Sequence, residues 1–199
     1  MSAVLITRLK IADLAAWTAL DAGRRLLPAG YALSRIVREE LYLFEPERGA
    51  STDAFEGALA RAIERSNFFV NPNKEQYTFH TAAEKGEAIP TPEGAWGILS
   101  RPRDEARDEG LRVRLLREHP LVGLGSIRRA RIWWLWTTGP GGRPALDAWY
   151  SILGPVTGRR RGLLVNPHAE AAIRIDHSIS WRSIEDFLVN PPPVVGAAA

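Results

Sequence analysis

The feature that most limits how this chain can fold is an internal repeat. Residues 68–79 read FFVNPNKEQYTF and residues 163–175 read LLVNPHAEAAIRI. Each segment has two apolar residues, then Val-Asn-Pro, two turn residues, a glutamate and an apolar strand. The repeated asparagines, Asn71 and Asn166, are 95 positions apart. A repeat of this period indicates a supersecondary unit that occurs twice.

The segments before the two Val-Asn-Pro sites also match. Apolar residues recur at helical spacing from Phe55 to Ile63 and again from Leu146 to Leu153. Further upstream, residues 13–27 and 104–118 are each predicted to be a helix that stops before a proline. Each half opens with a short predicted strand, over residues 3–9 and 94–101.

Between the two predicted helices of each half lies a basic stretch that ends in an apolar run. These stretches are residues 34–44 and 126–136. We expect each to form two strands joined by a tight turn, near Glu39-Glu40 and near Arg129-Ala130. The order β-α-β-β-α-β then occurs twice, which predicts an α+β protein of two tandem ferredoxin-like units with antiparallel sheets, arranged as a pseudo-dimer.

The predicted units span residues 1–80 and 94–176. The polar stretch 81–93, with a glycine and two prolines, is the expected linker. Residues 177–199 form a C-terminal extension, in which Ser183 and Asp186 are expected to cap one helical turn, followed by a disordered tail from residue 190.

Composition excludes several chemistries. The chain has no cysteine, so disulfides, thiolate catalysis and cysteine-based metal sites are excluded. Its four histidines show no ligand spacing, and no apolar run is long enough to span a membrane. We therefore expect a cytoplasmic protein with no metal and no cofactor. Only three of the 26 basic residues are lysine, and the net charge of +3 does not by itself indicate nucleic-acid binding.

Arg35-Ile36-Val37-Arg38 and residues 68–77 resemble PurS, the small subunit of phosphoribosylformylglycinamidine synthase in purine biosynthesis. Residues 163–170 carry a second copy of the same motif. The resemblance implies a non-catalytic subunit that bridges the glutaminase and synthetase subunits during glutamine-dependent amidation. Two units in one chain would make a covalent pseudo-dimer, although further self-association stays open.

Spacing assembles no catalytic set of nucleophile, base and orienting group. The candidate contacts with a protein partner are the arginines of the first basic strand and of the densest basic cluster: Arg35, Arg38, Arg159, Arg160 and Arg161. Trp133, Trp134 and Trp136 lie on one predicted strand, where Trp134 and Trp136 share a face.

Two alternatives remain open from the sequence. An RNA- or nucleotide-binding protein would use exposed strand tryptophans to stack on bases, although we do not expect nucleic acid as the partner. A small enzyme would need a polar pocket on the open face of the sheet. Burial of Trp134 and Trp136 distinguishes the first alternative from the bridging subunit.

Overall fold

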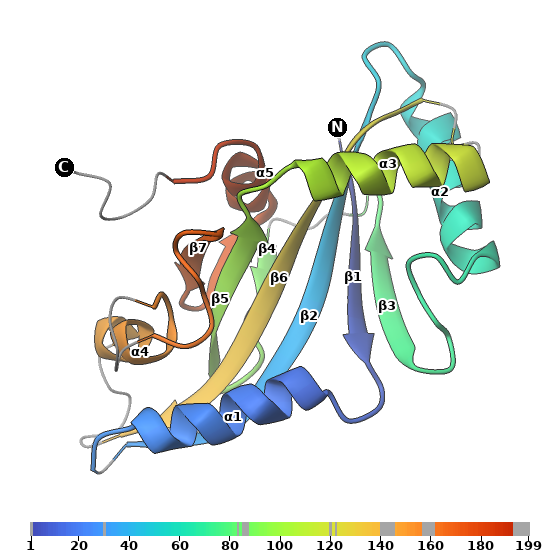
Figure 1. Ribbon diagram of the computed structural model, residues 1–199. Coiled ribbons are helices and arrows are strands. Elements are labelled where there is room, and N and C mark those ends of the chain that lie inside the picture. Colours follow the sequence, from blue (N-terminus) through green and yellow to red (C-terminus); the bar gives the residue numbers. More distant parts are fainter. Residues whose placement is uncertain are drawn as a thin grey trace. The chain divides into compact units, whose positions relative to one another are not determined.

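The computed structural model describes residues 2–29, 31–82, 84, 88–119, 121, 123–139, 146–156 and 162–192. These residues form an α+β structure with five helices and eight strands, which confirms the predicted class (Figure 1). In chain order the elements are β1 (Ala3–Leu9), α1 (Leu14–Leu26), β2 (Ala32–Pro46), α2 (Thr52–Arg65), β3 (Glu75–His80), β4 (Ala88–Pro90), β5 (Ala95–Pro102), α3 (Ala106–Glu118), β6 (Leu124–Thr138), α4 (Leu146–Leu153), β7 (Glu170–Ile175), β8 (Ser178–Ser180) and α5 (Trp181–Val189).

Six strands form one sheet in the order β3-β1-β2-β6-β5-β7. Strand β1 pairs antiparallel with β2 and β3, and β5 pairs antiparallel with β6 and β7. The short strands β4 and β8 form a separate antiparallel pair. The expected linker therefore contains a strand, and its partner lies in the C-terminal extension.

Side-chain caps set the starts of α1, α2 and α5. Asp13 Oδ1 accepts from the backbone N–H groups of Ala15 and Ala16, and Ser51 begins α2 in the same way. The C-terminal helix α5 differs from its prediction, because Ser180, and not Ser183, is its cap. Ser180 Oγ accepts from the Ser183 N–H at 3.0 Å, so the extension holds a nine-residue helix and not a single turn.

Strands β2 and β6 are each one uninterrupted strand of 15 residues. The turns predicted near Glu39-Glu40 and Arg129-Ala130 are therefore wrong. Neither dipeptide contains glycine, asparagine or proline, the residues that adopt tight-turn geometry most readily. The change from basic to apolar residues that suggested a turn occurs within a single extended strand.

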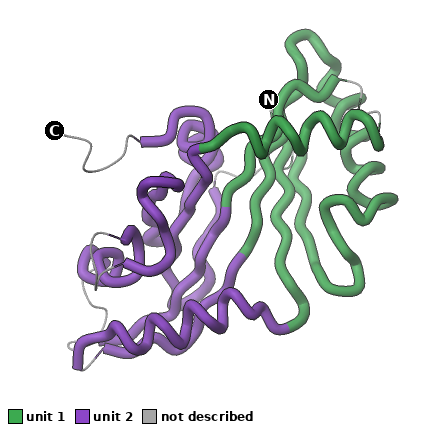
Figure 2. The backbone as a smooth tube through the Cα atoms, in the orientation of Figure 1, with its two compact units in different colours: residues 1–11, 39–86, 104–130 green, residues 12–38, 87–103, 131–199 purple. Residues whose placement is uncertain are grey.

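The chain divides into two compact units, and each takes segments from both sequence repeats (Figure 2). Unit 1 comprises residues 1–11, 39–86 and 104–130, and unit 2 comprises residues 12–38, 87–103 and 131–199. Strands β2 and β6 each pass from one unit to the other. Among the described residues, no helix is long and apolar enough to cross a membrane.

The core of unit 1 forms where α2 and α3 pack on the strands. Phe55 and Leu59 of α2 and Leu115 of α3 are at most 1% exposed. Strand β1 contributes Leu5 and the second half of β2 contributes Phe44, both fully buried. Ala3 and Leu5, alternate residues of β1, thus share the face that packs in this core, and Val4 on the other face is also fully buried.

The core of unit 2 is rich in tryptophan. Trp149 and Leu153 of α4 are fully buried, and Trp96 and Trp133 of β5 and β6 pack in the same cluster. Helix α5 is held by the side chain of Arg101, which is 1% exposed and donates to the carbonyl of Leu188. The C-terminal extension is therefore an integral part of this unit.

Candidate functional site

The first Val-Asn-Pro segment forms a closed hydrogen-bonded turn. The backbone N–H groups of Lys74 and Glu75 donate to the Asn71 carbonyl at 2.9 and 2.7 Å. The Asn71 side-chain oxygen accepts from Asn73 N at 3.1 Å, and Glu75 Oε2 accepts from Asn71 N at 2.7 Å. The asparagine and the glutamate therefore stabilise the turn that leads into β3.

The second segment forms the same turn. The N–H groups of Ala169 and Glu170 donate to the Asn166 carbonyl at 3.0 and 2.7 Å. The Asn166 side chain accepts from His168 N at 3.1 Å, and Glu170 Oε2 accepts from Asn166 N at 3.0 Å. Both repeated motifs thus have a local structural role.

A basic side chain anchors each turn from the preceding segment. Lys10 Nζ donates to the Pro72 carbonyl at 3.0 Å, and Arg103 Nε donates to the Pro167 carbonyl at 3.2 Å. Lys10 follows β1 and Arg103 follows β5, so these bonds occupy equivalent places in the two halves of the chain. The internal repeat therefore extends to side-chain contacts.

The strand tryptophans are mostly buried. Trp133 is 6% exposed and Trp134 is 2% exposed. A Cβ at Gly97 would lie 2.7 Å from the Trp134 ring, so glycine is required for this ring to pack on β5. The Trp134 ring is therefore not free to stack on a base, and only a small part of the Trp133 ring is exposed, which argues against RNA recognition through this strand.

Trp136 is half-buried and is engaged at both its edge and its face. Its indole N–H donates to the Glu93 carbonyl at 2.9 Å, and the Arg35 guanidinium lies 4.7 Å from its ring centroid. Arg35 itself is exposed.

Of the other proposed contact residues, Arg38 pairs with Asp13 at 2.9 Å. Arg159, Arg160 and Arg161 lie outside the described residues, as does the tail 193–199.

Unit 1 contains a partly buried charged cluster. Asp108 of α3 accepts from Arg129 Nε at 2.7 Å, and the Asp108 side chain is 6% exposed. Tyr42 lies near this pair, and burial, reinforced by the negative charge of Glu40, raises the pKa of Tyr42 to about 12. A phenol with this pKa is a poor general acid or base near neutral pH.

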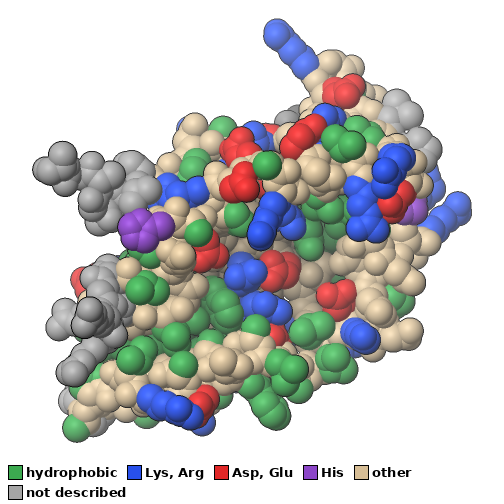
Figure 3. Space-filling model, in the orientation of Figure 1, with side chains coloured by type: hydrophobic (Ala, Val, Ile, Leu, Met, Phe, Trp, Pro, Cys, Tyr) green, Lys and Arg blue, Asp and Glu red, His purple; other side chains and the backbone are tan. Residues whose placement is uncertain are grey.

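A small polar pocket lies in the same unit, with a volume of about 110 Å³. Typical ligand pockets enclose about 300–1,000 Å³, so this one is small for a substrate. Among the residues that the structure describes, no three metal-ligating side chains converge. The pocket lining comprises Glu105, Asp108, Glu109, Ser126, Ile127 and Arg128. In Figure 3 acidic side chains gather around the first turn of α3 and basic ones farther along it.

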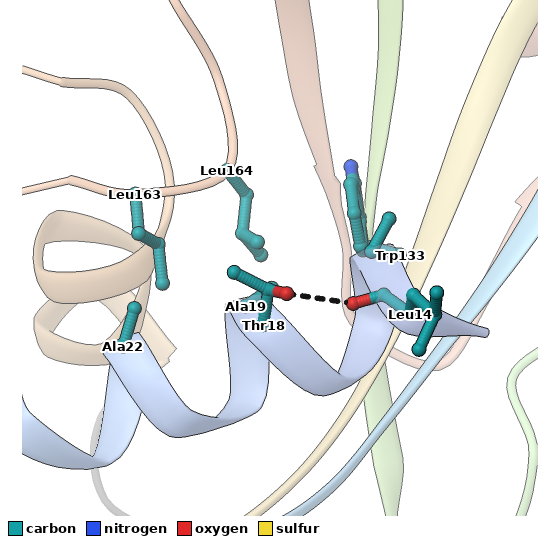
Figure 4. Close-up of a pocket in the computed structure, with 8 residues that line it drawn as sticks. Leu14, Thr18, Ala19, Ala22, Trp133, Leu163 and Leu164 are labelled. Carbon is teal, nitrogen blue, oxygen red and sulfur yellow. Dashed lines mark hydrogen bonds between the residues drawn. The ribbon is translucent and has the colours of Figure 1, made fainter. Parts of the chain in front are cut away.

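A larger, apolar cavity of about 450 Å³ lies in unit 2, beside α1, and is open to solvent on the side of the exposed Leu14 (Figure 4). One wall is the face of α1 that carries Thr18 and several alanines, and the others are the Trp133 ring and the leucines that precede the second turn. The Thr18 hydroxyl donates to the Leu14 carbonyl at 2.8 Å. The lining residues are Leu14, Ala15, Thr18, Ala19, Ala22, Trp133, Leu163 and Leu164.

Sequence reasoning missed this cavity. In the sequence, its alanines are typical of any helix. Helical spacing shows which residues share a face, but it does not show how much space they leave beside the helix. No family model matches the chain, and neither does a curated protein or a solved structure. The internal comparison of the two repeats is therefore the most direct guide to its sites.

Proposed function

We propose that this chain is a PurS-like, non-catalytic bridging subunit of phosphoribosylformylglycinamidine synthase, built from two ferredoxin-like units. The observation that carries the proposal is the repeated turn. The PurS-like motif occurs twice, and in both copies the asparagine, the glutamate and a preceding basic residue make the same bonds. This equivalence supports duplication of a PurS-like unit within one chain.

The strand order supports the ferredoxin-like part of the proposal. Unit 1 holds β3, β1, the second half of β2 and the first half of β6, together with α2 and α3. Unit 2 holds the corresponding set of β7, β5, the second half of β6 and the first half of β2, with α4 and α1, and in addition β4, β8 and α5. Each set has four strands and two helices, the content of one βαββαβ unit. In each set, one helix and one outer strand come from the other sequence repeat: α3 and β6 in unit 1, and α1 and β2 in unit 2.

A bridging role also agrees with the chemistry of the described residues. Their carboxylates and arginines are largely engaged with one another, as in the pairs Arg38–Asp13 and Arg129–Asp108. Arg35 is the contact candidate of choice, because it is exposed and its guanidinium is already positioned by the Trp136 ring. A positioned arginine on a surface is well suited to bind a carboxylate of a partner protein.

Co-purification with the glutaminase and synthetase subunits tests the proposal directly. With glutamine and ADP present, we expect the three proteins to elute together, and we expect glutamine-dependent amidation to require this chain. Failure of the wild-type chain to join the other two subunits would overturn the proposal.

A pair of variants tests the proposed contact. Arg35→Glu should weaken assembly, because it places a negative charge where the partner carboxylate is expected. Arg182→Glu makes the same charge change at a side chain that is 92% exposed on α5, and it should leave assembly unchanged. Equal effects of the two variants would refute a specific role for Arg35.

A further inference from the structure

The two units differ in how they fill the space beside the repeated turn. In unit 1 this space is occupied by aromatic rings. The ring centroids of Phe68 and Phe69 are 5.0 Å apart, and Phe69 meets Tyr42 edge to face at 5.4 Å. The Arg114 guanidinium of α3 covers Phe68 at 4.9 Å. In unit 1, two phenyl rings and a guanidinium therefore pack together beside the turn.

The equivalent residues of unit 2 follow from the turns and the strand registers. The two residues before Val-Asn-Pro are Leu163 and Leu164 in place of the two phenylalanines. Tyr42 is paired with Leu5 of β1, and Trp133 is paired with Ile98 of β5, so Trp133 takes the place of Tyr42. Trp133 thus keeps an aromatic wall, but leucines replace the two phenyl rings, and the Arg131 guanidinium lies 5.7 Å from the centroid of the Trp133 ring.

Helix α1 also carries smaller side chains than its counterpart in unit 1, α3. Counted from its cap, Ala22 of α1 stands where α3 has Arg114, and Ala19 stands where α3 has Leu111. Both alanines line the cavity of about 450 Å³, as do both leucines. Four smaller side chains therefore leave open in unit 2 the volume that unit 1 fills with two phenyl rings and a guanidinium.

We propose that unit 2 binds a planar, largely apolar aromatic molecule in this cavity, against the Trp133 ring. The volume lies within the range of small-molecule pockets. A ring placed edge to face against Trp133 reproduces the Phe69–Tyr42 contact of unit 1, a type of contact that stabilises beyond the area it buries. Eight residues line the cavity, whereas a stable protein interface takes about 20–30 residues per partner, so a small molecule is the occupant of matching size.

N-phenyl-1-naphthylamine is a suitable probe, because it is uncharged and its fluorescence rises in apolar surroundings. Charge-driven binding to the arginine-rich surface is therefore avoided. We expect saturable binding to the full chain. Leu164→Phe restores the unit 1 residue and should weaken binding at least about tenfold, because the new ring takes the ligand's place. Ala22→Leu narrows the cavity from the helix side and should act in the same direction.

Ala106→Leu is the matched control, because it lengthens an exposed alanine at the start of α3 in unit 1. It should leave probe binding unchanged. Circular dichroism establishes that each variant is folded. If Leu164→Phe does not fold, Ala22→Leu still tests the proposal, because Ala22 is a half-buried helix position. Absence of saturable binding, or full binding by a folded Ala22→Leu and Leu164→Phe, would overturn the proposal.

Discussion

The glutamates of the two repeated turns provide the sharpest test of their structural role. Glu75 and Glu170 each accept the N–H of the motif asparagine, at 2.7 and 3.0 Å. Replacing either by alanine leaves that N–H without its carboxylate partner. Because Asn71 and Asn166 also organise the rest of each turn, the loss should loosen the start of β3 or β7.

The expected loss in the free energy of unfolding follows from the type and burial of this hydrogen bond. A hydrogen bond to a charged group contributes about 1.5–3 kcal/mol when buried. The Glu170 side chain is 20% exposed, so water replaces part of the lost interaction and about 1–2 kcal/mol is expected. For a chain of this length, that corresponds to a fall in melting temperature of roughly 2–8 °C. Thermal and urea unfolding followed by circular dichroism measure both quantities.

The double variant adds a second criterion. The two turns lie in different units and have no hydrogen-bond partner in common, so the two losses should add to within about 0.5 kcal/mol. Glu64→Ala, at an exposed position of α2, is the control and should change stability by less than about 0.5 kcal/mol. If Glu75→Ala and Glu170→Ala were as mild as this control, the carboxylates would not hold the turns.

Three further results are expected. Ser180→Ala removes the cap of α5 and should cost about 1 kcal/mol in chemical denaturation. Leu153→Ala empties a fully buried site and should cost about 2–5 kcal/mol, whereas Leu14→Ala, at a side chain 74% exposed, should cost less than about 0.5 kcal/mol in the same assay. The pKa of Tyr42 is raised to about 12, above its value of about 10 in an unfolded chain. Stability should therefore fall as the pH rises from about 10 to about 12, and Tyr42→Phe should remove this part of the decline.

Helix and strand positions were largely predictable from the sequence, because they depend on local signals. The predicted strand 3–9 matches β1, and the helix expected over 13–27 is α1 with Asp13 as its cap. Apolar spacing placed α2 and α4, since each packs a single face on a core. The repeat also identified the turn glutamates, because each follows its motif asparagine at the same distance in the sequence.

The course of the long strands could not be predicted in this way. A stretch such as residues 34–44 has the composition of one strand or of two, and tertiary pairing decides between them. Strand β1 pairs with β2 only from Glu40 to Phe44, so the rest of β2 is free to continue into unit 2. The pairing of β4 with β8 likewise joins segments about 90 residues apart, which no local pattern reveals.

The surroundings of the candidate site were hidden from the sequence for a different reason. Sequence position placed the tryptophans on one strand, but the burial of Trp133 and Trp134 depends on how that strand is covered. The cavity beside α1 depends on differences in side-chain size between two repeats. Comparing Phe68 with Leu163 along the sequence shows that difference, but only the structure shows that a helix of alanines faces it.

The exchange of segments between the two units has a consequence for synthesis on the ribosome. Unit 1 begins with β1 at the start of the chain but also requires residues 104–130. Strand β1 can pair with β2 and β3 earlier, but the core of unit 1 stays incomplete until residues 104–130 have been made. This long-range closure favours slow folding and prolonged dependence on chaperones. Helix α1 waits longer still, because it belongs to unit 2, which also requires residues 131–199.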